Sequence, residues 1–247
     1  MIKLMNKLYK KSELWFALIW IIVYVVDTSI TDAISRVIGL EKILTAPYLL
    51  ILCIIALVWM KKNGLLEKYG LCKTDVGASK FMYYVPLVIL ASCNFWLGIS
   101  MNGSWVEFVL YAISMICVGF IEEIIFRGFL FRAMEKDGLK SAVIVSSVTF
   151  GIGHIVNLIN GSGATLLPNL CQVVSAVAFG FLFVILYYRG KSIIPCILTH
   201  SAINISSFFA NENAMNDKTR IIHSLILCAI ALAYTVVLIK TLPKREQ

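Results

Sequence analysis

Charge is scarce in this sequence. Only 15% of its 247 residues are Asp, Glu, Lys or Arg and 60% are hydrophobic, whereas a soluble domain is usually about a quarter charged and about half apolar. The apolar residues stand in long blocks, which indicates membrane spans rather than a large soluble core. The longest loops, about 61–80 and 210–220, are too short to fold alone. We therefore predict one integral-membrane domain over 1–247.

Residues suited to redox or metal chemistry are also few. There are only three histidines, and the HExxH pair of common zinc proteases is absent. The seven cysteines form no CxxC pair and lie mostly inside apolar blocks, so we interpret them as reduced packing residues. We expect no cofactor. Zinc remains an alternative, because Glu122, His154 and His200 could supply three ligands of a catalytic site. We favour it less than a metal-free site.

The apolar blocks predict an all-α fold, a polytopic membrane helical bundle of about eight transmembrane helices. A span needs about 20 mostly apolar residues. The first block is too long for the apolar core of a signal peptide, and no small-residue cleavage site follows it. The second block is short and the seventh is polar. The expected spans are 14–32, 46–60, 82–101, 105–126, 141–160, 165–188, 192–209 and 221–240.

The placement of basic residues predicts the orientation. With both termini in the cytoplasm, 18 of the 22 Lys and Arg residues fall in inside segments, as the positive-inside rule requires. Only Arg36, Lys42, Lys218 and Arg220 then lie outside. The bias explains the net charge of +8 by topology, so we expect no nucleic-acid partner. A multi-pass protein of the cell membrane follows, and the Ile- and Lys-rich composition favours a bacterial plasma membrane.

One expected helix is longer than its membrane span. Its apolar periodicity continues from about Trp105 to Lys136, and Gly138 is a typical stop signal. The next helix runs back from about Ser141. Glu122 and His154 each lie thirteen residues from this turn, about 20 Å at 1.5 Å per residue. We therefore expect the two side chains at the same depth.

Two adjacent carboxylates stand at the end of the fourth apolar block. Ionisable groups in spans are costly and usually functional. Glu123 and Arg127 are i and i+4 and can form an ion pair. Glu122 points about 100° away and can face a cavity.

Two further motifs repeat the four-residue spacing. Phe150 and His154 flank Gly151 and Gly153, two glycines that would let a neighbour or a substrate backbone come close. His200 and Asn204 project from one helix face as hydrogen-bond donors. Glu122 with His154 could take a proton from water, and the second pair could bind an oxyanion.

These three ordered motifs, Glu122-Glu123-x-x-x-Arg127, Phe150-x-x-x-His154 and His200-x-x-x-Asn204, resemble those of the CPBP intramembrane proteases. This family, also called Abi, includes the type II CAAX prenyl endopeptidases. The resemblance covers 118–207, the expected catalytic core. It implies a metal-independent glutamate endopeptidase in which Glu122 and His154 activate water. It further implies that His200 and Asn204 form the oxyanion hole, supported by Glu123 and Arg127.

The expected substrate is a membrane-associated or lipidated peptide or protein that enters a pocket open to the cytosol. Family resemblance makes peptide-pheromone maturation, bacteriocin processing and self-immunity plausible roles. Two other function classes stay open: a non-catalytic membrane scaffold or regulator on the same fold, and a proton-coupled transporter. A transporter would favour an internal pseudo-repeat, and the sequence has none. Phe150 could serve only packing, and Asn94 and Gln172 are expected to make interhelical contacts.

Overall fold

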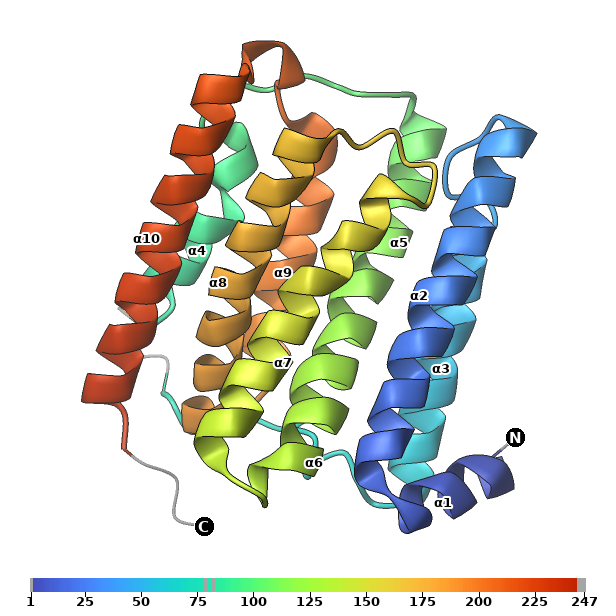
Figure 1. The fold of residues 1–247 in the computed structure, drawn as a ribbon, viewed down its shortest axis with the longest axis vertical. Helices are drawn as coiled ribbons and strands as arrows, with labels where there is room; N and C mark the ends of the chain where they lie inside the picture. Colours follow the sequence, from blue (N-terminus) through green and yellow to red (C-terminus); the bar gives the residue numbers. More distant parts are fainter. Residues whose placement is uncertain (1, 78–79, 81–82, 244–247) are drawn as a thin grey trace.

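The structure is a computed structural model, and it describes residues 2–77, 80 and 83–243. The described residues form a bundle whose long helices run side by side from one end of the molecule to the other, with α1 at one of these ends (Figure 1). The α-helices are α1 (Ile2–Lys11), α2 (Glu13–Ile38), α3 (Thr45–Lys62), α4 (Val85–Ala91), α5 (Trp105–Glu123), α6 (Arg132–Glu135), α7 (Leu139–Gly153), α8 (Leu166–Gly190), α9 (Ile194–Ser206) and α10 (Asp217–Thr241).

Six helical stretches of the described chain are long and apolar enough to cross a membrane: Glu13–Ile38, Thr45–Lys62, Trp105–Glu135, Leu139–Leu158, Leu166–Gly190 and Asp217–Thr241. They coincide with six of the eight expected spans, so the helical membrane bundle is confirmed. The seventh expected span, 192–209, is the shorter apolar stretch Ile194–Phe209.

The third expected span, 82–101, was wrong as a span. Its described part holds only the seven-residue helix α4 and a 3-10 turn at Cys93–Phe95. After α4 the backbone tightens into this 3-10 turn, and a side chain of the turn bonds to the end of α9. Asn94 donates its amide to the carbonyl of Ile203 at 2.7 Å, which also confirms the expected interhelical contact of Asn94.

The helix expected over Trp105 to Lys136 is continuous from Trp105 to Glu135, but its middle is unusual. Residues Ile124–Phe131 form a π-helix, and all eight are buried. A π-helix widens the turn to i→i+5 bonds and is frequent at functional sites. It follows directly after Glu123, so it sets the direction of every side chain beyond the two carboxylates.

The end of the bundle that carries α1 is filled with aromatic side chains. Phe129 of the π-helix makes ring contacts with aromatic residues from α2, α3 and the following loop, at centroid distances of 4.9 to 5.9 Å. The partners are Phe16, Trp20, Trp59 and Tyr69. This packing leaves little empty space in this half of the molecule.

Small residues let the central helices approach closely. A Cβ at Gly119 of α5 would lie 2.2 Å from the Ser201 hydroxyl of α9. One at Gly180 of α8 would lie 2.8 Å from the Ser147 backbone of α7. Backbones pack closely in membranes where small residues allow it. The contact at Gly119 lies one turn from Glu122 and draws the acidic segment toward α9.

Candidate active site

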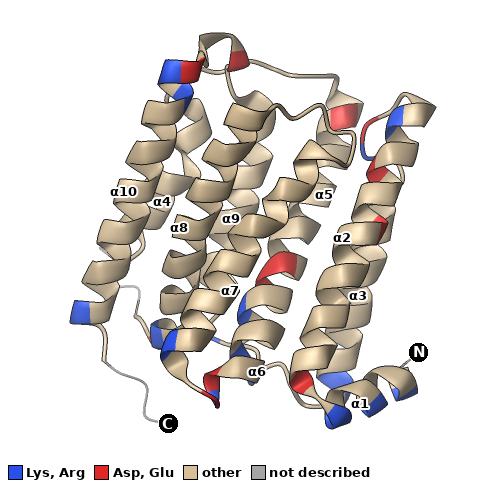
Figure 2. Ribbon diagram, viewed as in Figure 1, with Lys and Arg blue, Asp and Glu red and all other residues tan. Residues whose placement is uncertain are grey.

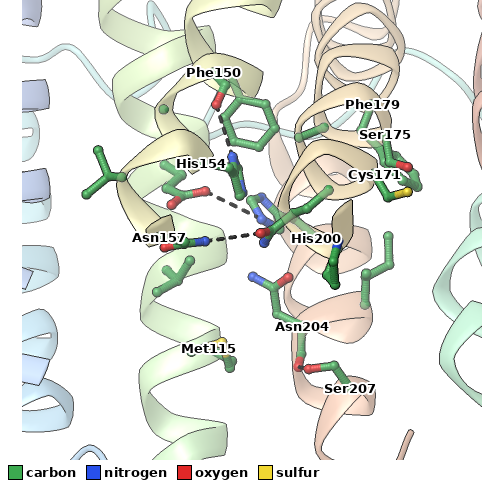
Figure 3. A pocket seen from close by; sticks show the side chains of 18 of the residues that line it. Met115, Phe150, His154, Asn157, Cys171, Ser175, Phe179, His200, Asn204 and Ser207 are labelled. Carbon is green, nitrogen blue, oxygen red and sulfur yellow. Dashed lines mark hydrogen bonds and ion pairs between the residues drawn. The ribbon is translucent and has the colours of Figure 1, made fainter. Parts of the chain in front are cut away.

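A cavity of about 510 Å³ lies between α2, α5, α7, α8, α9 and α10. Glu122, His154, His200 and Asn204 all line it, and so does Phe150. Figure 3 shows His154, His200 and Asn204 pointing into the space between α5, α7 and α9. The volume falls in the usual range of ligand pockets, roughly 300–1,000 Å³. The three sequence motifs therefore converge on one cavity.

Behind the cavity lies a fully buried ion pair. Arg127 and Glu123 have no exposed side-chain area, and their nearest N and O atoms are 3.2 Å apart, as the i and i+4 spacing predicted. The contact lacks hydrogen-bond geometry, and none of the three guanidinium nitrogens has a hydrogen-bond partner among the described residues. The guanidinium lies over the Phe150 ring, 4.0 Å from its centroid. Phe150 therefore packs on Arg127 as well as lining the cavity.

Glu123 also orients His200. The Nδ1 atom of His200 lies 2.9 Å from Glu123 Oε1. A carboxylate only accepts, so Nδ1 carries a proton in this contact. The other nitrogen, Nε2, is left to face the cavity side, where it lies 3.6 Å from Glu122 Oε2. The first carboxylate of the motif thus faces the cavity, while the second holds a histidine from behind.

Glu122 has a partner that the motif does not contain. The hydroxyl of Tyr24, from α2, donates to Glu122 Oε1 at 2.5 Å. Glu122 Oε2 is buried and has no hydrogen-bond partner among the described residues. Buried polar atoms nearly always find a partner, in the protein or in water. One oxygen of this carboxylate is therefore held, and the other is left for a small polar molecule.

His154 sits where α7 tightens into a 3-10 turn. Its Nδ1 lies 3.2 Å from the carbonyl of Phe150, and because a carbonyl only accepts, Nδ1–H is the donor. Nε2 is then free to accept a proton from the cavity side. The side chain of Asn169 donates to the His154 carbonyl at 2.8 Å and fixes this turn to α8. The Phe150 ring contacts both His154 and His200 edge to face, so one aromatic ring packs against both imidazoles.

The cavity wall next to this cluster carries several carboxamide side chains. Asn204 points into it one turn beyond His200 (Figure 3). Asn157 Nδ2 donates to Gln172 Oε1 at 3.1 Å, linking the turn after α7 to α8. The interhelical contact expected of Gln172 is thus confirmed. His223 of α10 also lines the cavity and contacts the Cys93 carbonyl through Nε2 at 3.1 Å.

The expected direction of the pocket and the expected orientation of the termini do not agree with each other. The cavity reaches the end of the bundle opposite α1, where Lys42, Asn160 and Glu212 line it. A cytoplasmic N-terminus and a pocket open to the cytosol therefore exclude each other. The direction of α5 determines this arrangement. The helix begins at the end opposite α1, and Glu122 lies some 17 residues along it.

Sequence reasoning missed two features of the site. Tyr24 lies outside the three motifs, in a span whose aromatic residues give no periodic signal. The π-helix also has no sequence signature that single-chain pattern reading detects. What could have pointed to Tyr24 is its position: it lies one turn from Asp27, inside an otherwise apolar span.

Fold and site together define a polytopic membrane protein with an acid–base cluster buried at the bottom of a cavity. Residues 103–206 match the family model described as type II CAAX prenyl endopeptidase Rce1-like. The segment contains every residue of the three motifs. No curated protein and no solved structure matches the chain. The family supports an endopeptidase activity of the CAAX-protease type in a multi-pass membrane protein.

Proposed function

We propose that the protein is an intramembrane endopeptidase that hydrolyses a peptide bond with water activated by Glu122. The observation that carries this proposal is the unequal environment of the two Glu122 oxygens. Oε1 is held by the Tyr24 hydroxyl, and Oε2 is buried at the cavity, without a hydrogen-bond partner among the described residues. A water that bonds to Oε2 would satisfy it. The carboxylate is then placed to remove a proton from that water.

His154 completes the water-activating pair. Its Nδ1–H is engaged by the Phe150 carbonyl, so a neutral ring presents a bare Nε2 to the cavity. That nitrogen can accept a hydrogen bond from the same water and fix its second proton. As the water oxygen bonds to the substrate carbonyl carbon, Glu122 takes one proton. It later gives that proton to the leaving amine, which restores the carboxylate and releases a new carboxyl group.

His200 and Asn204 supply the oxyanion donors. The Asn204 carboxamide can donate from its NH₂ group. Because Nδ1 of His200 already donates to Glu123, Nε2 can donate to an oxyanion only in the imidazolium form. In that form Glu122, Glu123, Arg127 and His200 together carry no net formal charge. Donors placed in advance toward developing charge lower the barrier in a low-dielectric site.

We keep the proposal metal-free. Its chemistry needs only a base, a water and two donors, and Glu123 occupies Nδ1 of His200. No group of three or more possible metal ligands gathers among the residues that the structure describes. The physiological substrate that we propose is a membrane-associated peptide of a bacterium, in pheromone maturation or in bacteriocin processing and self-immunity.

Comparative peptidomics tests the function and identifies the substrate in the same experiment. A deletion strain is rescued with the wild-type protein, with Glu122→Gln, or with Glu107→Gln as a matched control from the start of α5. We expect cleaved peptides that appear with the wild type and with Glu107→Gln but not with Glu122→Gln. Glu122→Gln membranes must contain the protein at the wild-type level. If Glu122→Gln restores the same peptides, the proposal is wrong.

A further inference from the structure

The cavity reaches one end of the bundle, the end opposite α1. On α3, α7, α9 and α10 the lining residues come from the half remote from α1, and on α5 and α8 they extend past the middle of the helix, to Glu122 and Phe183. On α2 they run from Tyr24 to Asp32, and on α10 from Arg220 to Leu227. Among the described residues, none from 2–23, 50–92, 127–149 or 184–199 reaches the cavity. The cavity therefore gives a substrate a route to the Glu122 cluster from the end opposite α1.

The other end is closed by packed side chains. Directly beyond Phe126 lie Arg127, Phe129 and Phe131, each exposed by 1% or less. The aromatic residues around Phe129 fill the space between α2, α3 and the π-helix. Interiors packed in this way hold few voids larger than a water molecule. Within the described part of the chain, no passage of peptide size leads from the α1 end to the carboxylates.

The charges assign the two ends to the two sides of the membrane. Figure 2 shows basic residues concentrated at the α1 end. The buried Arg127 belongs to neither end. Lys and Arg in short loops mark the cytoplasmic side. The α1 end holds Lys3, Lys7, Lys10, Lys11, Lys61, Lys62, Lys68, Lys73, Lys80, Arg132, Lys136, Lys140, Arg189, Lys191 and Lys240, and the opposite end holds Arg36, Lys42, Lys218 and Arg220.

Three of the four basic residues at the cavity end have structural partners at its mouth. Lys42 pairs with Asp32 at 2.9 Å, and Arg220 pairs with Glu212 at 3.0 Å. Arg36 donates to the Asn160 carbonyl at 2.7 Å. These cations tie α2, the turn after α7 and α10 to neighbouring loops around the mouth. These contacts give the cations at the cavity end a local structural role. The excess of Lys and Arg at the α1 end therefore marks that end as cytoplasmic.

We propose that the cavity opens on the extracytoplasmic side and takes an extended peptide segment presented there, not a cytosolic tail. The inference rests on the proposed function and names its substrate class. At the floor, Phe126, Phe150 and Phe183 offer an apolar surface for a side chain next to the cleaved bond. On the wall, the carboxamides of Asn157 and Asn204 can bond to the N–H and C=O groups of an extended backbone. The substrate is a secreted or outer-leaflet peptide with an apolar residue at the cleavage site.

Cysteine accessibility tests the direction of the cavity. All seven cysteines are free among the described residues and are replaced by alanine or serine. Single cysteines are then introduced by Met115→Cys in the cavity (Figure 3) and by Ser162→Cys, an exposed position in the loop that follows the lining residue Asn160. Lys136→Cys probes the α1 end. Ile116→Cys is the matched control, because the neighbouring side chain on α5 is 52% exposed on the outside of the bundle. A charged, membrane-impermeant methanethiosulfonate reagent is applied to intact and to permeabilised cells.

We expect the reagent to modify Met115→Cys and Ser162→Cys in intact cells, and Lys136→Cys only after permeabilisation. Ile116→Cys, facing lipid, should react at least tenfold more slowly than Met115→Cys. Modification of Lys136→Cys in intact cells would overturn the orientation. A Met115→Cys protein that reacts only after permeabilisation, or never, would overturn the open cavity.

The labelling does not depend on catalysis, so its failure and that of the proposed function can be told apart. The Met115→Cys protein is also labelled in the Glu122→Gln background, where the pattern should be unchanged. If labelling follows the expectation but Glu122→Gln still cleaves, the access route stands and the mechanism falls. Where cleavage is present, external modification of Met115→Cys should slow it at least tenfold. Unchanged cleavage after complete modification would contradict substrate entry by this route.

Discussion

Replacing Glu123 by Gln removes the countercharge of a guanidinium that has no contact with solvent. Arg127 has no exposed area, and its nitrogens have no hydrogen-bond partner among the described residues. Its remaining favourable contacts are the Phe150 ring at 4.0 Å and the Phe183 ring at 5.5 Å, and a close cation–π contact contributes roughly 2 kcal/mol when desolvated. Because Gln still accepts from His200 Nδ1, the variant removes charge while keeping the hydrogen bond.

The expected cost is large. Removing one partner of a buried ion pair costs about 3–5 kcal/mol, because the other charge stays buried without compensation. For a chain of this length 1 kcal/mol corresponds to a change in Tm of about 2–4 °C, so we expect Tm to fall by about 6–20 °C. The double variant Glu123→Gln/Arg127→Met removes both charges and should recover most of this loss. Its cleavage rate should stay low, since Nδ1 of His200 no longer faces an anion.

Thermal unfolding of the purified proteins in one detergent measures these differences, with cleavage rates measured on the same samples. The reasoning requires the single variant to be less stable than the double variant. If Glu123→Gln unfolds within 2 °C of the wild type, or if the double variant is the less stable of the two, Arg127 does not depend on Glu123 for its charge. The buried ion pair would then not be the support of the site.

Three further predictions follow from single contacts. Gly151→Ala should destabilise the protein, because its Cβ would lie 2.3 Å from Val177. The Cβ of Gly153→Ala would meet nothing within 4 Å, so this variant should change only KM. Equal Tm values for the two variants would refute this contrast. Tyr24→Phe should lower kcat/KM about ten- to a hundredfold, the effect of losing a hydrogen bond to a charged group worth about 1.5–3 kcal/mol, with Tm nearly unchanged; wild-type kcat/KM would show that Glu122 needs no support from α2. A chelator should leave cleavage unchanged, and activity lost in chelator but restored by zinc would replace the metal-free mechanism.

Much of the fold could be predicted from hydropathy and spacing. Six long apolar blocks became helices because burying twenty backbone amides in lipid leaves no alternative. The region 82–101 could not be predicted in this way, because its 3-10 turn bonds through Asn94 to the distant α9. The Glu123–Arg127 pair was predictable since both partners lie on one helix. The contact of Tyr24 with Glu122 joins residues 98 positions apart, and no local pattern encodes it.

The end at which the cavity opens could not be predicted from the sequence either. Sequence placed the basic residues correctly on one set of loops, but it could not show from which end the helices part. That depends on where bulky aromatic side chains such as Phe129 fill the bundle and where small and polar residues leave space.

Cleavage by the purified Glu122→Gln protein tests the central claim most directly. The substrate is a peptide found by the peptidomic comparison, and the variant keeps the shape of the side chain and its contact with Tyr24. We predict a rate lower by a factor of about 10²–10⁴, the usual contribution of a general base, at an unchanged Tm. A rate within twofold of the wild type would contradict the account.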